Sequence, residues 1–407
     1  MHTKNTKAAG PRRGMIAISI FTLIASLAFA FPVVAQVPCC PDARPSGPNG
    51  AAPASTPVLY LTGPIGPTPQ PDPQLLPPGA STGIDVAPLS YYVDSTDANA
   101  AYALGAQQGM QDASVYKSAQ TLVILDFGQP NYNASTNTYD AYLTRSDAPE
   151  ITNSQIEAVA KSFALGYANA VIGGSSALFL IIGTNNVANL ATYYDHGAAW
   201  ANLVIKIQAD INSAGFAPYV RVEAGNDVEG NPKQHFEPPS LTRTWFAGFA
   251  SVANTQTPPL VVFDYGDAGG CPENSYMRSD TKDGTGLCCL VGQTCSPTSS
   301  DVYTQGDFWY ISFGSGVSLP LPEIYNTGGA NARQWGQIAL YSQQQQHQFF
   351  PMEGPLVQAA ACSQPGAQSC TGIDNTAQMA YSQLTTVFSA PPLSTSAFSY
   401  YSDIKHQ

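Results

Sequence analysis

The stretch TLVILDFG, residues 121–128, decides the fold class of this 407-residue chain. Its apolar residues are continuous rather than alternating, which is typical of a strand buried on both faces of a parallel sheet. Comparable apolar runs of strand length occur at 177–184, 219–224, 260–265, 308–313 and 319–325, with a last one near 349–353. We therefore expect a sheet of parallel strands on both sides of the 121–128 segment.

Helix-like segments separate these runs, at 153–171, 196–214, 241–253, 330–343 and 376–388. With a first strand at 89–93 and a first helix at 98–110, the alternation predicts an α/β protein with a single-domain (β/α)8 TIM-like barrel. An open doubly wound sheet is the alternative. No glycine-rich phosphate loop opens any of the predicted helices, which favours the barrel.

Residues 1–84 are expected to lie outside the barrel. Residues 1–35 combine basic residues, an apolar run and a small-residue site, which predicts a signal peptide cleaved after Ala35 and a secreted protein. The pair Arg12-Arg13 resembles a twin-arginine export signal, and an uncleaved signal anchor is the alternative. The proline-rich residues 36–84 predict a disordered linker, which leaves 85–407 for the barrel.

The composition limits the classes of partner. Acidic residues outnumber basic ones by 28 to 16, which gives a net charge of −12. No basic patch offsets this charge, so nucleic-acid binding is excluded. Beyond the leader no apolar run is long enough to span a bilayer, so no membrane span is expected after signal removal.

The eight cysteines all follow the leader, and their even number in an exported chain predicts disulfides. Cys362 and Cys370 are close enough to close one loop, and Cys271 is expected to pair within the cluster at 288–295. A zinc site is the alternative, but the cluster lacks the usual two-residue ligand spacing and has no histidine nearby. No metal and no other cofactor is therefore expected.

Acidic residues gather at the carboxyl ends of the predicted strands, where barrel enzymes carry their active sites. Glycosidic bond cleavage needs two carboxyl groups, one protonated and one ionised. Asp227 and Glu229, two residues apart after the third strong strand, are the expected acid–base pair. Asp126, Asp264 and Glu323 are candidates for the opposing carboxylate. The structural alternatives are turn or helix capping for Asp126 and Asp264, calcium binding or capping for Asp227 and Glu229, and packing for Glu323.

Four more residues are candidates for substrate binding, namely Glu223, Asn226, Tyr325 and Trp335. Tyr325 shares strand parity with the acid two residues before it. Glu223 shares a face with Arg221, and these two could instead form an ion pair without a catalytic role. A tryptophan such as Trp335 is more often part of a protein core than a platform on which a sugar stacks. The zinc peptidase motif and the serine hydrolase elbow are both absent.

Several of these segments resemble the glycoside-hydrolase-like barrels of secreted bacterial proteins. The resemblance lies in the strand-end Asp126, the NDVE segment at 226–229 and the expected strand at 309–313. Lysozyme-type muramidases among these barrels carry a strand-end Asp-x-Glu pair and an early strand-end Asp. The segments HGAAW (196–200), PEIY (322–325) and NARQW (331–335) are similar to those of exported proteins of actinobacterial type.

The resemblance implies that Asp227 and Glu229 form the acid–base centre and that Asp126 assists. Glu223 has no counterpart in it, and the cysteine-rich insert at 271–295 departs from the muramidase pattern. Two classes of function follow. The first is a secreted hydrolase that cleaves a cell-wall or extracellular polysaccharide, peptidoglycan included. The second is a non-catalytic secreted barrel that binds a glycan or a surface partner.

Overall fold

The computed structural model describes residues 87–407 except 117–119, 144–148, 188–192, 231–235, 280–283, 290–294, 366–369 and 396. The predicted signal peptide and proline-rich linker lie outside the described residues. No helix in the described part of the chain is long and apolar enough to cross a membrane.

Eight parallel strands form the main sheet, in the spatial order β10-β11-β1-β2-β6-β7-β8-β9. They are β1 (Leu89–Tyr92), β2 (Gln120–Asp126), β6 (Ala177–Asn185), β7 (Val220–Asp227), β8 (Val262–Asp264), β9 (Ser318–Pro320), β10 (Leu356–Val357) and β11 (Ser402–His406). From β1 to β9, strands of the main sheet that follow one another along the chain also lie side by side. The α/β class and the parallel sheet are therefore confirmed.

The sheet is curved into a half-barrel and is not the closed TIM barrel that the sequence predicted. Its edge strands β9 and β10 share no ladder, and an isolated bridge between Glu323 and Leu356 joins them instead. One physical reason is local: Pro320 and Pro322 have no N–H group to donate, so the β9 segment cannot sustain a regular ladder.

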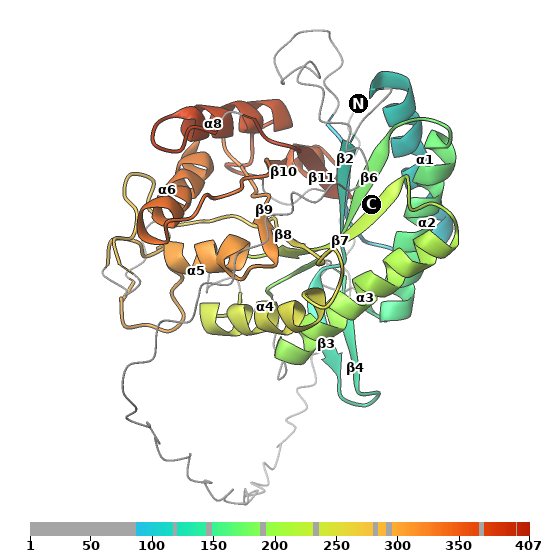
Figure 1. Ribbon diagram of the computed structural model, residues 1–407, viewed down its shortest axis with the longest axis horizontal. Coiled ribbons are helices and arrows are strands. Elements are labelled where there is room, and N and C mark those ends of the chain that lie inside the picture. Colours follow the sequence, from blue (N-terminus) through green and yellow to red (C-terminus); the bar gives the residue numbers. More distant parts are fainter. Residues whose placement is uncertain are drawn as a thin grey trace, which may run out of the picture. The chain divides into compact units, whose positions relative to one another are not determined.

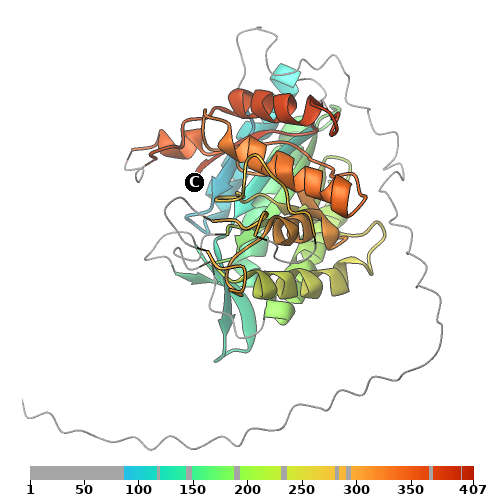
Figure 2. The same cartoon turned by 90° about the vertical axis from the view of Figure 1, so that its left-hand side faces the viewer.

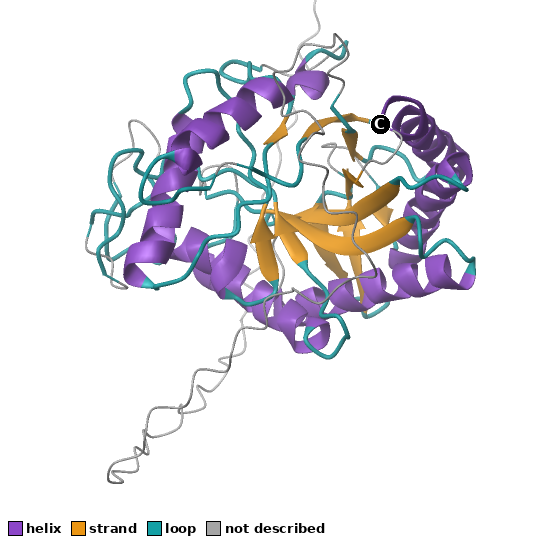
Figure 3. Ribbon diagram, turned by 45° about the horizontal axis from the view of Figure 1, so that its top comes forward, coloured by secondary structure: helices purple, strands orange, loops and turns teal. Residues whose placement is uncertain are grey.

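Helices connect the strands and cover the convex face of the sheet (Figure 1, Figure 3). They are α1 (Ala98–Gln111), α2 (Asn153–Val171), α3 (Tyr193–Ser213), α4 (Pro239–Ala253), α5 (Gln305–Trp309), α6 (Ala330–Gln345), α7 (Ala359–Cys362) and α8 (Ala377–Ser389), with π-helical turns η1 (Asp112–Tyr116) and η3 (Tyr310–Gly314). A small antiparallel sheet of β3 (Gln129–Asn133), β4 (Thr138–Tyr142) and β5 (Glu150–Ile151) follows β2. In both Figure 1 and Figure 2, α6 and α8 lie side by side.

Two apolar layers hold the half-barrel together. The larger one packs the helices against the convex face, and it includes Phe163 of α2 and Val262 of β8. The smaller one fills the concave face, and it includes Ile124 of β2 and Phe263 of β8. Because neighbouring residues in a strand point to opposite faces, a strand such as β2 contributes to both layers, with Val123 in the larger and Ile124 in the smaller.

The predicted strand at 308–313 is wrong, because this segment is helical. Thr304 caps α5, and its side chain and that of Asp307 each accept a hydrogen bond from the other's backbone N–H. Such a capping box fixes a helix start. Phe308 and Ile311 are three residues apart and both buried, which is a helical spacing within a continuous apolar run. The strand expected near 349–353 lies instead at β10, and β11 was not predicted.

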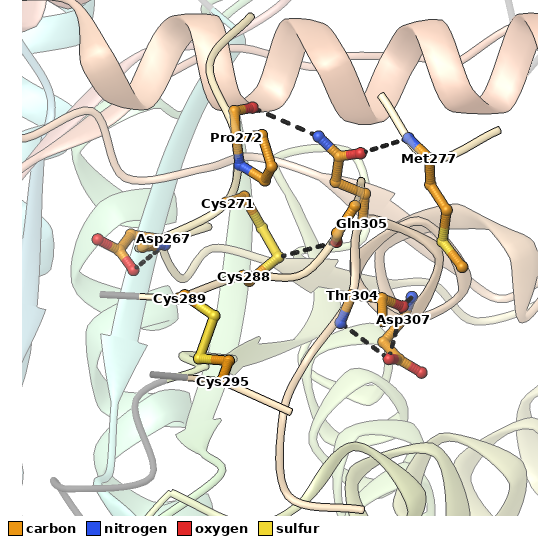
Figure 4. Close-up of a disulfide and its surroundings, with 12 residues drawn as sticks. Asp267, Cys271, Pro272, Met277, Cys288, Cys289, Cys295, Thr304, Gln305 and Asp307 are labelled. Carbon is orange, nitrogen blue, oxygen red and sulfur yellow. Dashed lines mark hydrogen bonds between the residues drawn. A yellow bond between two sulfur atoms is a disulfide. The ribbon is translucent and has the colours of Figure 1, made fainter. Parts of the chain in front are cut away.

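Three disulfides join Cys271 to Cys288, Cys289 to Cys295 and Cys362 to Cys370. The expected pairings of Cys362 with Cys370 and of Cys271 within the later cluster are confirmed, while Cys39 and Cys40 lie outside the described residues. The Cys271–Cys288 bond closes the insert between β8 and α5. Figure 4 shows Gln305 of α5 holding that insert, since its side chain donates to Pro272 O at 3.3 Å and accepts from Met277 N at 2.7 Å.

Candidate active site

The side chains on the concave face follow from strand alternation and register. In β2, Leu122 and Ile124 belong to the concave apolar layer, so Asp126 points to the same side. In β7, Glu223 is in register with Ile181 of the concave layer, so Asp227, four residues later, also faces that side. The sheet therefore brings Asp126 and Asp227 to its concave face at the carboxyl ends of the strands.

Tyr265 fills the space between these two strand ends. A Cβ atom on Gly183 would lie 2.3 Å from the Tyr265 hydroxyl, and one on Gly225 would lie 2.7 Å from its ring. No real Cβ atom tolerates such contacts, so the two glycines make room for the ring. The fully buried Tyr265 donates its hydroxyl hydrogen to Thr184 O at 3.1 Å.

Three carboxyl groups meet at the mouth of the half-barrel. Asp227 ends β7, Glu229 follows two residues later, and Glu323 follows β9. One carboxylate oxygen of each lies within 4.8 Å of the other two. Asp227 and Glu229 are half-buried, whereas Glu323 is fully buried. We call these three residues the carboxylate cluster; Asp227 and Glu229 are its partly exposed members.

Tyr325 bridges two members of the cluster. Its hydroxyl lies 3.1 Å from Oε1 of Glu229 and also contacts Oε2 of Glu323. A hydroxyl carries one hydrogen and donates to one of these oxygens at a time, so Glu229 and Glu323 share a single donor at this point.

Further donors converge on Glu323. The side-chain amide of Gln358 donates to its Oε1 at 2.7 Å, and the hydroxyl of Tyr92 donates to the same oxygen at 3.4 Å. Together with Tyr325, these groups surround Glu323 with hydrogen-bond donors, which offset part of the cost of burying a charge there.

Burial and mutual repulsion raise the pKa values throughout the cluster. Burial and the neighbouring acids raise the pKa of Asp227 and of Glu323 well above the usual range. Burial, followed by the charge of Asp267, raises the pKa of Glu229 to about 8. Since like charges at this spacing cannot all ionise, the cluster retains protons at neutral pH.

Two more acids border the cluster. Asp126 is fully buried, and burial raises its pKa to about 6. Asp267 follows β8, its Oδ1 accepts from Gly269 N at 2.8 Å, and burial raises its pKa to about 6. Asp267 was not among the predicted site residues, although the sequence places it three residues after a strand-end acid.

The side-chain amide of Asn186 holds the segment that carries Glu229. Its Oδ1 accepts from the backbone N–H of Glu229 at 3.1 Å, and its Nδ2 donates to the Glu229 carbonyl at 2.8 Å. Both backbone groups of Glu229 are thus fixed from the neighbouring strand end. Asn186, Tyr92, Tyr265 and Gln358 were not predicted; for Asn186 the only sequence signal was the Asn pair that ends the 177–184 strand.

Asp264 does not join the cluster. Asp126 is in register with Gly183, Gly183 with Gly225, and Gly225 with Phe263. Asp264 therefore lies one residue out of step with Asp126 and points to the convex face. There Ser312 of η3 donates to its Oδ2, and burial raises its pKa to about 7.

The four predicted substrate-binding residues are divided. Tyr325 lies beside the carboxylate cluster, in contact with Glu229 and Glu323. Glu223 lies deeper on the concave face, where it accepts from Arg221 Nε at 2.5 Å and from Val261 N at 2.7 Å, so both its oxygens are occupied. Asn226, on the other side of β7 from Asp227, faces the helices. Trp335 is fully buried in α6 and packs on aromatic rings, which makes it a core residue.

The arrangement can transfer protons, and it can also bind a cation. Three carboxyl groups of different exposure share protons with a tyrosine hydroxyl, which suits general acid–base chemistry. The same oxygens, once ionised, are of the kind that Ca²⁺ and Mg²⁺ prefer.

No protein-family model matches the chain, and no curated protein is significantly similar to it. The inference of function therefore rests on the geometry of the carboxylate cluster.

Proposed function

We propose that this protein is a secreted glycoside hydrolase that cleaves a cell-wall or extracellular polysaccharide. The observation that supports the proposal is the carboxylate cluster, in which Asp227, Glu229 and Glu323 approach within 4.8 Å at the carboxyl ends of parallel strands. Three disulfides and the absence of a membrane-spanning helix among the described residues agree with an extracellular location.

Glu229 is the general acid in this proposal. Its side chain is half-buried and so can reach a substrate, and its pKa of about 8 keeps it protonated at neutral pH. The proton passes to the glycosidic oxygen as the bond to the leaving sugar breaks.

Asp227 is the carboxylate that faces the anomeric carbon. Its Oδ1 is buried and has no hydrogen-bond partner among the described residues. Burial and the neighbouring acids raise the pKa of Asp227 in the free protein, and the positive charge that develops at the anomeric carbon favours its ionised form as the glycosidic bond breaks. Donors from Tyr92, Tyr325 and Gln358 already occupy both oxygens of Glu323, which therefore acts through its neighbours.

The separation of the acids predicts the stereochemistry. Retaining enzymes hold their two carboxyl groups about 5–5.5 Å apart and inverting enzymes about 6.5–9.5 Å apart. The cluster, with oxygens within 4.8 Å, is closer to the retaining spacing. We therefore expect the first product to keep its anomeric configuration, which proton NMR of a fresh digest measures.

New reducing ends released from a panel of polysaccharides and peptidoglycan test the activity. Glu229→Gln should lower turnover about 10²–10⁴-fold, as loss of a general acid does, and Asp227→Asn should also abolish most of it. Asp112→Asn, a buried acid beside α1, is the matched control and should retain turnover. Near-normal turnover in both cluster variants would contradict the site, and glycan binding without products would favour a non-catalytic binder.

A further inference from the structure

One acid at the mouth has one oxygen with a partner and one without: the Oδ1 of Asp126 accepts from Gly128 N at 2.6 Å. Asp126 is fully buried, it faces the concave side beside Asp227, and its Oδ2 has no hydrogen-bond partner among the described residues. Its charge contributes to the raised pKa values of Asp227 and Glu323, so it lies within electrostatic reach of both. A buried carboxylate oxygen without a donor is costly unless a ligand supplies one.

None of the ion pairs among the described residues fills this need. Within the described ranges, the ion pairs of the basic residues involve acids elsewhere: Arg221 with Glu223, Arg243 with Asp307, Arg333 with Glu273, His406 with Asp94, and Lys161 and Lys206 with acids of α2 and α3. None of them reaches Asp126, Asp227, Glu229, Asp267 or Glu323, which we call the acidic mouth.

We infer that the sugar bound at the acidic mouth is a cationic amino sugar, so that the substrate is a polysaccharide with free, non-acetylated amino groups. This inference rests on the proposed function. An ammonium group carries three N–H donors and one positive charge, and it can supply the donors that Oδ2 of Asp126 and Oδ1 of Asp227 lack in the free protein. A uronic acid or another anionic sugar would be repelled by the same acids.

Binding of such a sugar must also release protons. The acidic mouth retains protons at neutral pH because its members repel one another when ionised. A positive charge placed among them favours their ionised forms and lowers their pKa values. A neutral N-acetylated sugar provides no such charge and leaves the protons in place.

Isothermal titration calorimetry on the full chain at pH 6 tests this inference. The ligands are glucosamine oligomers, the matching N-acetylglucosamine oligomers and calcium chloride, each titrated in two buffers of different ionisation enthalpy. We expect the glucosamine oligomer to bind at least tenfold more tightly than the acetylated one, with a buffer-dependent heat that reports proton release. Equal or tighter binding of the acetylated oligomer, or binding of calcium alone, would overturn the inference.

Variants assign the effect to the acidic mouth. Asp126→Asn and, as a second variant on a half-buried residue, Asp267→Asn should each weaken glucosamine binding by about tenfold or more, whereas Asp112→Asn should bind as the unchanged protein does. Folding of each variant is checked by circular dichroism. If both mouth variants fold and bind normally, the inference is wrong.

The outcomes separate this inference from the proposed function. Cleavage of neutral or acetylated polymers without binding of glucosamine oligomers would leave the hydrolase standing and reject the cationic substrate. Tight glucosamine binding with proton release, but no new reducing ends from any polymer, would reject the hydrolase and retain the cation site.

Discussion

Replacing Glu229 by glutamine should stabilise the protein relative to the unchanged protein, and this gain in the free energy of unfolding should grow as the pH rises. The folded state keeps the Glu229 proton up to a pKa of about 8, whereas the unfolded chain loses it near the ordinary value of 4.5. Above pH 4.5 the unfolded state binds fewer protons than the folded state, so the free energy of unfolding falls as the pH rises to about 8. Glutamine does not titrate and escapes this loss, and it preserves an acceptor for Tyr325.

The magnitude follows from the same two pKa values. Each pH unit in this window changes the free energy of unfolding by up to about 1.4 kcal/mol per proton, so Glu229 alone loses at most about 3.4 kcal/mol between pH 4.5 and pH 7. Partial exposure and sharing of protons with Asp227 reduce this figure, and we expect Glu229→Gln to gain about 1–2 kcal/mol at pH 7.

Urea denaturation at pH 4.5, 6, 7 and 8 measures the difference between the variant and the unchanged protein. We expect it to be near zero at pH 4.5 and to grow steadily up to pH 8. Asp195→Asn, which removes an exposed acid in the first turn of α3, is the control and should show no such growth. A Glu229→Gln variant that loses stability equally at every pH would refute the reasoning.

Three further predictions concern the scaffold. Gly225→Ala should destabilise the protein by about 1–3 kcal/mol in urea denaturation, because the added methyl group overlaps the ring of Tyr265; loss below about 0.5 kcal/mol would contradict the close contact. Replacing Cys362 and Cys370 together by serine should cost about 2–3 kcal/mol from the short loop they close, and an unchanged thermal midpoint would argue against the bond. His196 is buried, and burial lowers its pKa to about 4, so stability should fall as the pH drops from 6.5 to 4; His196→Gln should lack this part of the acid denaturation curve.

Much of the carboxylate cluster could be predicted from the sequence, because it depends on local spacing. Asp227 and Glu229 are two residues apart just after a strand, and Glu323 and Tyr325 share the same spacing after another. Each pair therefore projects from the end of its strand toward the mouth. The convergence of the two pairs follows from the common carboxyl edge of parallel strands.

The errors arose where register between distant strands decides the outcome. Asp126 and Asp264, each at the end of its strand, were both candidates for the opposing carboxylate, but β8 is shifted by one residue relative to β2, which turns Asp264 to the opposite face. Strand β11, with the polar sequence SDIKH, has no apolar run that would mark it. The prediction of a closed barrel was also wrong. Whether the edge strands pair depends on contacts between β9 and β10, and these strands have only 3 and 2 residues, too few for a pattern in the sequence to indicate their pairing.

The position of β11 has a consequence for the order in which the protein can mature. This strand lies between β10 and β1, and the hydroxyl groups of Ser90 and Ser402 hydrogen-bond at 2.8 Å although 312 residues separate them. While the chain is being synthesised, β1 lacks its neighbour until residues 402–406 have emerged from the ribosome. A nascent chain therefore keeps an open sheet edge at β1 while all the segments from β2 to β10 are made, and such edges are the surfaces that chaperones must protect.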